Sequence, residues 1–342
     1  MSTISFDEAI KRSKGKRYLL LGNGFSISLF PKVFSYNSLL SEADFENKNT
    51  KEVFNILKTS DFERVIKSLK DTAKIVPIYS ENNEKLAEEI KQEADSLKNI
   101  LVETITKNHP AKISEITDQQ LKSAMAFLKN FQGNKIYTLN YDLLLYWTLL
   151  SGESGPDKID DGFRNPDNEF GADYRTFDSP QSPTFWYLHG GLHLFDAGSE
   201  VRKYIWSNTG RPIMGQVREA LDKELYPLFV AEGSSEEKLE KITHSGYLSK
   251  ALRSFEAICE QKKADLFILG HSLADNDDHV LEKIVKGTIS RVFISLYRPD
   301  SDESKSIIKK AEKLRSDRSN KNPLEVVFFD SETAHVWDSK VE

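Results

Sequence analysis

The stretch Lys16-Arg-Tyr-Leu-Leu-Leu-Gly-Asn-Gly-Phe-Ser26 decides the fold that we expect for this chain. Its apolar run ends abruptly at Gly22-Asn23-Gly24, and an amphipathic segment follows. This order predicts a strand, a glycine turn and a helix. Because glycine has no Cβ, such a turn brings backbone N–H groups and a helix N-terminus close to an anion. The alternative interpretation is a tight turn that binds nothing.

Six later apolar runs are interpreted as further strands, and most of them end in glycine or polar residues. These runs are residues 135–139, 185–188, 227–231, 265–269, 291–296 and 324–329. Most of them are separated by segments with helical spacing, and such alternation is typical of a parallel sheet covered on both faces. The sequence therefore predicts a single α/β domain over residues 1–342, with a Rossmann-like parallel sheet.

Two regions do not fit this alternation. Residues 42–132 have mostly helical periodicity, which predicts a helical insertion subdomain between the first two strands. Residues 151–184 are rich in glycine and proline, and so long a connection is typical of a lid or an active-site loop. We expect the helical insertion to provide a regulatory or contact surface.

The composition excludes several classes of protein. The 342 residues carry a net charge of −6, so the chain as a whole lacks the basic character of a nucleic-acid-binding protein. The single cysteine, Cys259, permits neither an internal disulfide nor a cysteine-rich zinc module. No apolar run reaches about 18 residues and the N-terminus has no apolar leader, so we expect a cytoplasmic protein without a membrane anchor.

Polar residues gather where the predicted strands end. The main segments are Gly22-Asn23-Gly24-Phe25-Ser26, Thr138-Leu139-Asn140-Tyr141-Asp142, His189-Gly190-Gly191 and Gly270-His271-Ser272-Leu273. Ligands of open parallel sheets bind beyond the carboxyl ends of the strands. We therefore expect these segments, which are far apart in the sequence, to converge on one binding site.

In this order the four segments resemble the motifs of the sirtuin-like NAD-consuming family, in particular its short, zinc-free prokaryotic NAD-hydrolase branch. That family has a Gly-x-Gly-x-Ser turn, a Thr-x-Asn-x-Asp strand end, a His-Gly pair and a late Gly-x-Ser-Leu loop. The resemblance extends over most of residues 17–297, apart from the helical insertion. It implies NAD as the substrate and no metal.

The resemblance also implies roles for individual residues. Asn140 would position the nicotinamide ribose and the attacking water, Asp142 would orient that site, and His189 would act as general base. The glycine turn would hold the pyrophosphate, and Ser272 would contact the adenosine ribose. The residues expected to bind the dinucleotide are Gly22, Asn23, Gly24, Phe25, Ser26, Thr138, Gly270, His271 and Ser272.

The implied chemistry suits these residue types. Breaking the nicotinamide–ribose bond builds positive charge on the ribose, which a carboxylate and an amide oxygen stabilise. A neutral imidazole can direct and deprotonate water near neutral pH. Simpler interpretations stay open: Asn140 and Asp142 can cap the next helix, and His189 can be a hydrogen-bonded structural residue. His193 is expected to be structural.

Residues 274–279, Ala-Asp-Asn-Asp-Asp-His, contain acids and a histidine of the kind that bind metals. We expect instead that the acids cap a helix beginning near Asp277 and face water.

The expected activity is hydrolysis of NAD(+) to nicotinamide and ADP-ribose, by an enzyme that resembles anti-phage effectors. Because uncontrolled NAD depletion is toxic, we expect a regulatory protein partner or a homo-oligomer. The single cysteine argues against a sirtuin deacylase, and Ile27 breaks the Gly-x-Gly-x-x-Gly spacing of dehydrogenases. The alternatives are a sensor that binds NAD or ADP-ribose without turnover, and a scaffold without a ligand.

Overall fold

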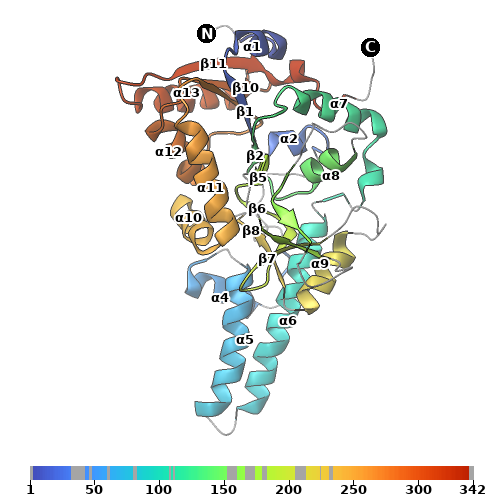
Figure 1. Ribbon diagram of the computed structural model, residues 1–342. Coiled ribbons are helices and arrows are strands. Elements are labelled where there is room, and N and C mark those ends of the chain that lie inside the picture. The colour runs from blue at the N-terminus through green and yellow to red at the C-terminus, as the bar shows by residue number, and fades with distance from the viewer. Residues whose placement is uncertain are drawn as a thin grey trace.

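A six-stranded parallel sheet forms the centre of the computed structural model (Figure 1). From one edge to the other its strands are β5 (Phe185–Tyr187), β2 (Ile136–Thr138), β1 (Lys16–Leu21), β9 (Ala264–Leu269), β10 (Arg291–Leu296) and β11 (Glu325–Asp330). Numbered along the chain, the order is 3-2-1-4-5-6, which is that of doubly wound dinucleotide-binding folds. The expected Rossmann-like α/β fold is confirmed.

The structure describes most of the chain. The described residues are 3–31, 43–45, 48–59, 62–79, 83–107, 109–110, 112–151, 160–165, 174–178, 183–204, 213–223, 225–230 and 234–338.

A second, antiparallel sheet has five strands. Their order is β3 (Phe163–Arg164), β4 (Tyr174–Phe177), β7 (Val201–Tyr204), β6 (Gly190–Asp196) and β8 (Tyr226–Phe229). The prediction that residues 227–231 add a strand to the parallel sheet is wrong, because β8 pairs antiparallel with β6. An apolar run does not specify whether its strand pairs parallel or antiparallel with a neighbour.

The region predicted as a lid, residues 151–184, contributes to this second sheet. Its described part supplies β3 and β4, which pair with each other, and β4 also pairs with β7. Residues 152–159, 166–173 and 179–182 of that region lie outside the described residues.

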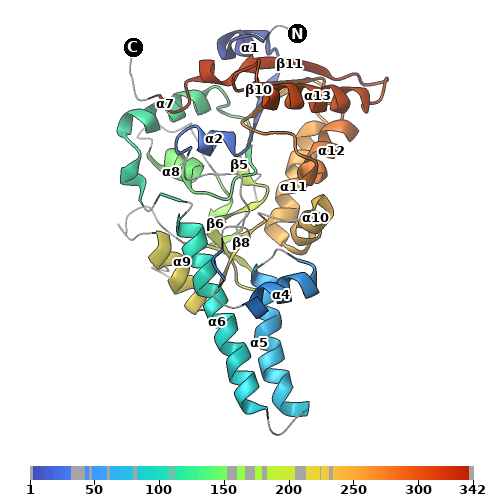
Figure 2. The same cartoon turned by 180° about the vertical axis from the view of Figure 1, so that it is seen from behind.

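Helices cover both faces of the parallel sheet. Figure 1 shows α2, α7 and α8 to the right of the strands and α11, α12 and α13 to the left, and Figure 2 shows the same division from behind. These helices are α2 (Gly24–Ile27), α7 (Asp118–Lys129), α8 (Leu144–Ser151), α11 (Gly246–Cys259), α12 (Asp278–Lys286) and α13 (Asp302–Ser316). In α11 the buried side chains recur at helical spacing, as expected of a helix with one face on a core. They are Tyr247, Leu248, Ala251, Leu252, Phe255, Ile258 and Cys259.

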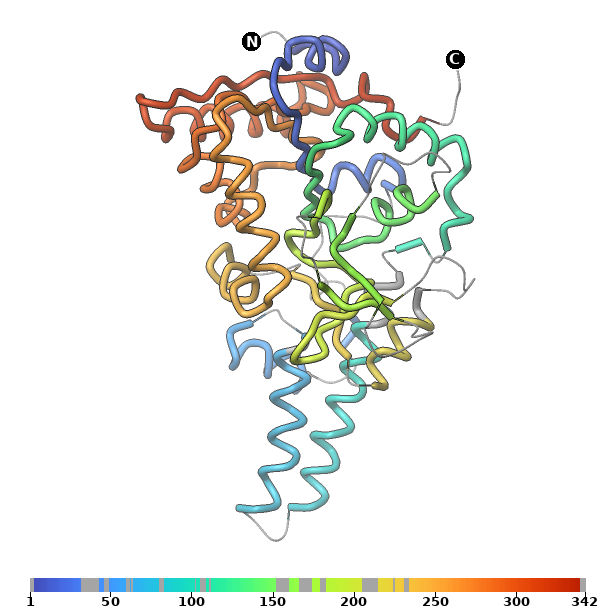
Figure 3. Tube along the Cα trace, in the orientation of Figure 1, coloured from blue at the N-terminus to red at the C-terminus, as the bar shows by residue number. Residues whose placement is uncertain are grey.

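The expected helical insertion, residues 42–132, consists of two parts with different surroundings. Helices α5 (Phe62–Tyr79) and α6 (Glu84–Lys107) pack against each other as a hairpin that projects away from the parallel sheet (Figures 1 and 3). At its base lie α4 (Lys48–Leu57) and α9 (Ile213–Asp222), and α9 packs on β6 and β8. Helix α7, in contrast, lies on the parallel sheet. Among the described residues, no helix combines the length and apolar character of a membrane span.

Aromatic side chains fix the peripheral helices to the sheet. Phe267 of β9 stacks on Phe293 of β10, with ring centroids 4.4 Å apart, and it also contacts Phe131 just beyond α7. Phe6, in α1 (Phe6–Arg12), contacts both Phe127 of α7 and Phe267. These rings are buried, so a single apolar core joins the N-terminal helix, α7 and the central strands.

Two glycine loops meet where the strand order reverses, between β1 and β9. The amide of Gly22 donates to the carbonyl of Leu269 at 2.9 Å, and that of Gly24 donates to Gly270 at 2.7 Å. A Cβ on Gly24 would lie 2.6 Å from the Cα of Gly270, and Gly270 has a φ of +70°. Both positions therefore require glycine, Gly24 for space and Gly270 for space and conformation.

We predict that Gly270→Ala destabilises the protein by about 3 kcal/mol, combining about 1 kcal/mol for the left-handed conformation with overpacking against Gly24. Gly133 is a matched control, since its φ is +76° and nothing lies within 4 Å of its Cβ position. Gly133→Ala should therefore cost only about 1 kcal/mol. Urea unfolding of both variants measures the difference, and equal losses would contradict the close packing of the two loops.

Candidate functional site

The glycine turn after β1 uses its backbone amides within the fold. Besides the bonds of Gly22 and Gly24 to the β9 loop, Phe25 donates to the carbonyl of Gly22 at 3.0 Å. Ser26 and Ile27 both donate to the carbonyl of Asn23. The predicted pyrophosphate contact of this turn stays a prediction, and the demonstrated role of its glycines is close packing of two loops.

Three predicted site residues form one buried hydrogen-bonded network. The side-chain amide of Asn140 donates to the carbonyl of Gly22 at 3.1 Å and to the hydroxyl of Ser26 at 3.0 Å. Ser26 donates in turn to Asp142 at 2.5 Å. Because Nδ2 makes both donations, the amide orientation of Asn140 is determined, and its Oδ1 has no bonded donor among the described residues. An acceptor oxygen is thus held at the carboxyl ends of β1 and β2.

Asp142 combines two interpretations that the sequence left open. Its Oδ1 accepts from the amide of Leu144 at 2.9 Å, so it caps the start of α8, while Oδ2 accepts from Ser26. The hydroxyl of Thr138 accepts from the amide of Asn140 at 3.0 Å and supports the same turn. Burial raises the pKa of Asp142 to about 6, although the bonds from Ser26 and Leu144 oppose this shift. The carboxylate of Asp142 therefore holds the hydroxyl of Ser26 and the start of α8 in place.

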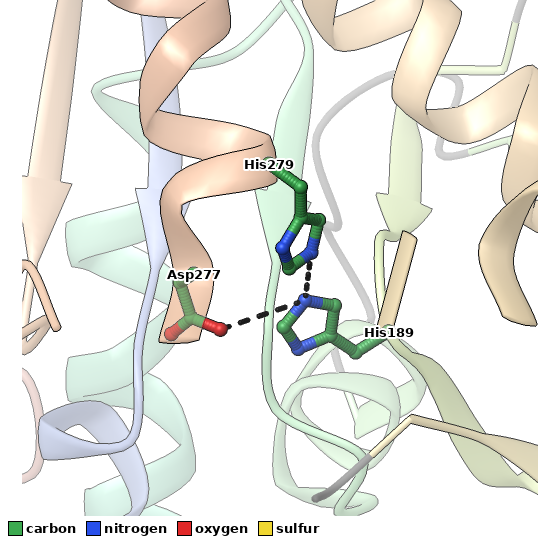
Figure 4. A group of neighbouring side chains, drawn as sticks. All are labelled: His189, Asp277 and His279. Atoms are coloured by element: carbon green, nitrogen blue, oxygen red, sulfur yellow. Dashed lines mark hydrogen bonds and ion pairs between the residues drawn. The ribbon is translucent and has the colours of Figure 1, made fainter. Parts of the chain in front are cut away.

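His189 lies at the junction of the two sheets, directly between β5 and β6. Its carbonyl accepts from the amide of Val230 at 2.8 Å, and the following Gly190 has a φ of +73°. Its ring nitrogen Nε2 lies 3.0 Å from Nε2 of His279 and 3.9 Å from Oδ1 of Asp277 (Figure 4). The side chain is thereby aimed at the N-terminus of α12.

Asp277 is the charged centre of this second group of side chains. Lys238 donates to its Oδ1 at 2.7 Å, and His271 lies 2.9 Å from its Oδ2. Because Nδ1 of His271 accepts from the amide of Leu273, the proton of His271 is on Nε2 and points to Asp277. Burial alone would raise the pKa of Asp277, but the bond from His271 and the positive charge of Lys238 hold it well below its usual range.

For residues 274–279, the predicted start of the helix is confirmed, but the prediction that Asp277 caps it and faces water is wrong. Helix α12 begins at Asp278, as expected, but Asp277 makes no side-chain cap hydrogen bond and is buried. The carboxylate turns inward because it neutralises Lys238, which comes from α10 (Ser235–His244). A capping box between Ser234 and Glu237 starts α10 and places Ser235 and Lys238 on one face of that helix.

His189, Asp277 and His279 offer three donor atoms within 4.8 Å of one another, a spacing that a metal ion could bridge. The charge of Lys238 argues against this use. A divalent ion bound to Asp277 would lie about 4 Å from the ammonium, and their repulsion would be roughly 8 kcal/mol at an effective dielectric constant of about 20. Lys238 already matches the single negative charge of Asp277. We therefore interpret the group as a hydrogen-bonded cluster.

The structure brings the predicted segments together at one end of the sheet, but it divides their side chains between two networks. The amide of Leu188 donates to the carbonyl of Thr138 at 2.8 Å, so the segments that carry Asn140 and His189 lie side by side. Asn140 bonds toward β1, whereas His189 bonds toward α12. The two networks come close together at Gly22. Its carbonyl accepts from Asn140, and a Cβ on Gly22 would lie 2.7 Å from the Cβ of His271.

The other predicted site residues differ in how deeply they are buried. The buried ring of Phe25 packs against Trp337, whose indole N–H donates to the carbonyl of Phe25 at 2.7 Å. Asn23 and Ser272 are half-buried. His193, expected to be structural, is fully buried between the rings of Tyr146 and Tyr187.

Sequence reasoning missed three members of the site: Ser235, Lys238 and His279. Ser235 and Lys238 belong to a helix with a solvated pattern, and only the capping signal Ser234-x-x-Glu237 marks where that helix starts. In the sequence, His279 stands at the end of an acidic segment. The available signal was its position two residues after Asp277, just past the Gly270-His271 strand end.

Four buried histidines predict acid sensitivity. Burial lowers the pKa of His109 and His279 to about 4 and that of His189 to about 3, and it lowers the pKa of His193 as well. The unfolded chain binds protons near pH 6.5 and the folded chain does not. Stability is therefore complete above pH 6.5 and falls below it, by about 1.4 kcal/mol per pH unit for each histidine.

The raised pKa of Asp142 acts in the opposite direction below about pH 6, but it offsets only one histidine. Urea unfolding at pH 7.5 and pH 5.5 should show the loss. His244→Ala, which changes an exposed histidine, should leave the pH dependence unchanged. A free energy of unfolding that stays constant or rises toward pH 5.5 would contradict neutral burial of these rings.

Comparison of the sequence with curated proteins finds no match. Residues 19–337 match a protein family described as a domain of unknown function, DUF4917. The match begins within β1, ends after the last strand and includes both side-chain networks. The chain belongs to this family.

Proposed function

We propose that this protein is an NAD(+) glycohydrolase, which cleaves the nicotinamide–ribose bond to give nicotinamide and ADP-ribose. One observation carries the proposal: Asn140 and the neutral ring of His189 follow β2 and β5, the two adjacent strands on one side of the point, between β1 and β9, where the strand order reverses. That point is where doubly wound sheets bind dinucleotides. The resemblance of the four strand-end motifs to zinc-free NAD hydrolases supports the same substrate.

The geometry of Asn140 supports a direct role at the reacting ribose. Both hydrogens of its amide are committed to Gly22 and Ser26, so Oδ1 is the atom that can accept a hydrogen bond from water or a ribose hydroxyl. In the reaction, the electron pair of the C–N bond leaves with nicotinamide, and the oxygen of water bonds to the cationic carbon. An oriented amide oxygen stabilises that cation and directs the water.

His189 supplies the proton acceptor in this proposal. Burial lowers the pKa of His189 to about 3, even though Asp277 opposes the shift, so the ring is neutral at physiological pH and retains a lone pair. It would take the proton that water or a ribose hydroxyl loses. Asp277, 3.9 Å away, stabilises the imidazolium that forms. Asp142 is a positioning residue, since it reaches Asn140 only through Ser26.

The biological setting that we propose is cytoplasmic defence against phage by NAD depletion, with a regulatory protein or a homo-oligomer as the control. The resemblance supports this setting. The α5–α6 hairpin supports a contact surface, because Ile78 and Tyr79 at its free end are 78% and 86% exposed. Large apolar side chains that project from a helical hairpin are typical of protein contacts.

We predict that purified protein releases nicotinamide from NAD, measured by chromatography with candidate activators present. Asn140→Ala and His189→Ala should each lower the rate by a factor of about 100 or more, because each removes a group that acts on the reacting atoms. His244→Ala and Asn55→Ala change exposed residues of the same types and should retain full activity.

Calorimetry with NAD separates the outcomes. Equal NAD binding by wild type, Asn140→Ala and His189→Ala without any product would replace the enzyme with a sensor. If the wild type neither binds nor cleaves NAD in any oligomeric state, both the enzyme and the sensor are refuted.

A further inference from the structure

We propose that His279 is a positioning residue, which commits Nε2 of His189 to a ring–ring hydrogen bond and leaves Nδ1 of His189 as the basic atom. The inference deepens the proposed function and rests on it for its catalytic meaning. Its structural content, the location of one proton, can be measured without any reaction.

The contact between the two rings requires one shared proton. Their Nε2 atoms are 3.0 Å apart, both rings are buried, and the ring planes differ by 27°. Two lone pairs at this distance would repel each other, and two N–H groups would clash. One nitrogen therefore donates and the other accepts, so each ring has a defined tautomer.

Ser235 permits two arrangements of that proton. Its Oγ accepts from the amide of His279 at 2.7 Å and lies 3.1 Å from Nδ1 of the same ring. If Ser235 donates to Nδ1, then Nε2 of His279 carries the proton and donates to His189. If Nδ1 carries the proton and donates to Ser235, then Nε2 of His279 accepts from His189.

The surrounding charges favour the second arrangement. Asp277 lies 3.9 Å from Nε2 of His189 and so stabilises a proton on that nitrogen. Lys238 bonds to the same oxygen of Asp277 and opposes part of this attraction, while His271 bonds to the other oxygen. With Nε2–H on His189, the lone pair of His189 is on Nδ1, which points away from both His279 and Asp277 (Figure 4).

In this arrangement every proton is accounted for when His189 acts as a base. Water or a ribose hydroxyl loses its proton to Nδ1 of His189, which becomes an imidazolium. Its Nε2–H remains bonded to Nε2 of His279, and Nδ1–H of His279 remains bonded to Ser235. The dyad therefore orients the ring and disperses the positive charge, as the third member of a catalytic triad does for its histidine. His279 does not touch the substrate.

The decisive experiment is nitrogen NMR of the histidine side chains in the full-length protein. The chain has 7 histidines, and His189→Gln identifies the signals of His189. We expect Nδ1 of His189 to be unprotonated and Nε2 to be protonated. In His279→Phe, which keeps a ring of similar shape, this preference should be lost, and His279→Gln should retain it through the amide oxygen.

Kinetics provide the second readout. His279→Phe should lower kcat for NAD cleavage by a factor of about 10 to 100 with KM unchanged, and His279→Gln should restore part of it. Ser235→Ala should have a smaller effect, because it removes only the outer bond. A wild-type His189 with its proton on Nδ1, or variants that change KM alone, would overturn the inference. If the expected tautomer occurs in a protein that never cleaves NAD, the proposed function fails while the proton assignment stands.

Discussion

The contact between the backbones of Gly24 and Gly270 is the constraint on which the site depends. Two loops from opposite halves of the chain approach until the amide of Gly24 bonds to the carbonyl of Gly270 at 2.7 Å, a packing that leaves no room for a side chain at either position. Ser26 follows one loop and His271 belongs to the other. The separation of the loops therefore determines the distance between the two side-chain networks of the candidate site.

The chemistry of the second network follows from its burial. A buried ammonium and a buried carboxylate are tolerated only as a pair, and Lys238 and Asp277 form that pair at 2.7 Å. Because Lys238 offsets part of the attraction that Asp277 exerts on the rings of His189 and His279, burial keeps these two rings neutral. The pKa of His189 at about 3 reflects this balance, in which burial outweighs the attraction of Asp277. Among its described residues, the site therefore combines the neutral rings of His189 and His279 with an ammonium that is paired to Asp277.

The parallel sheet was predictable, but the junction that positions His189 was not. Apolar runs of four to six residues followed by glycine or a polar residue indicated β1, β2, β5 and β9 within a residue or two. The same kind of run placed β8 in the wrong sheet, because hydrophobicity does not encode pairing direction. Asn140, Asp142 and Ser26 lie together because they follow adjacent parallel strands, whereas His189, expected in the same group, bonds toward α12. His279 and Lys238 escaped prediction because their helices carry them to the site from outside the strand ends.

The amino-acid sequence by itself determined the α/β class, the order of the strand-end motifs and the need for glycine at the first turn. These properties are local, because they depend on runs of apolar residues and on the absence of a Cβ. Tertiary structure alone decided which side chains are partners: Ser26 with Asp142, Lys238 with Asp277, and His189 with His279. Hydrogen bonds and ion pairs act over a few ångströms, so residues separated by 39 to 116 positions become partners only after the chain has folded.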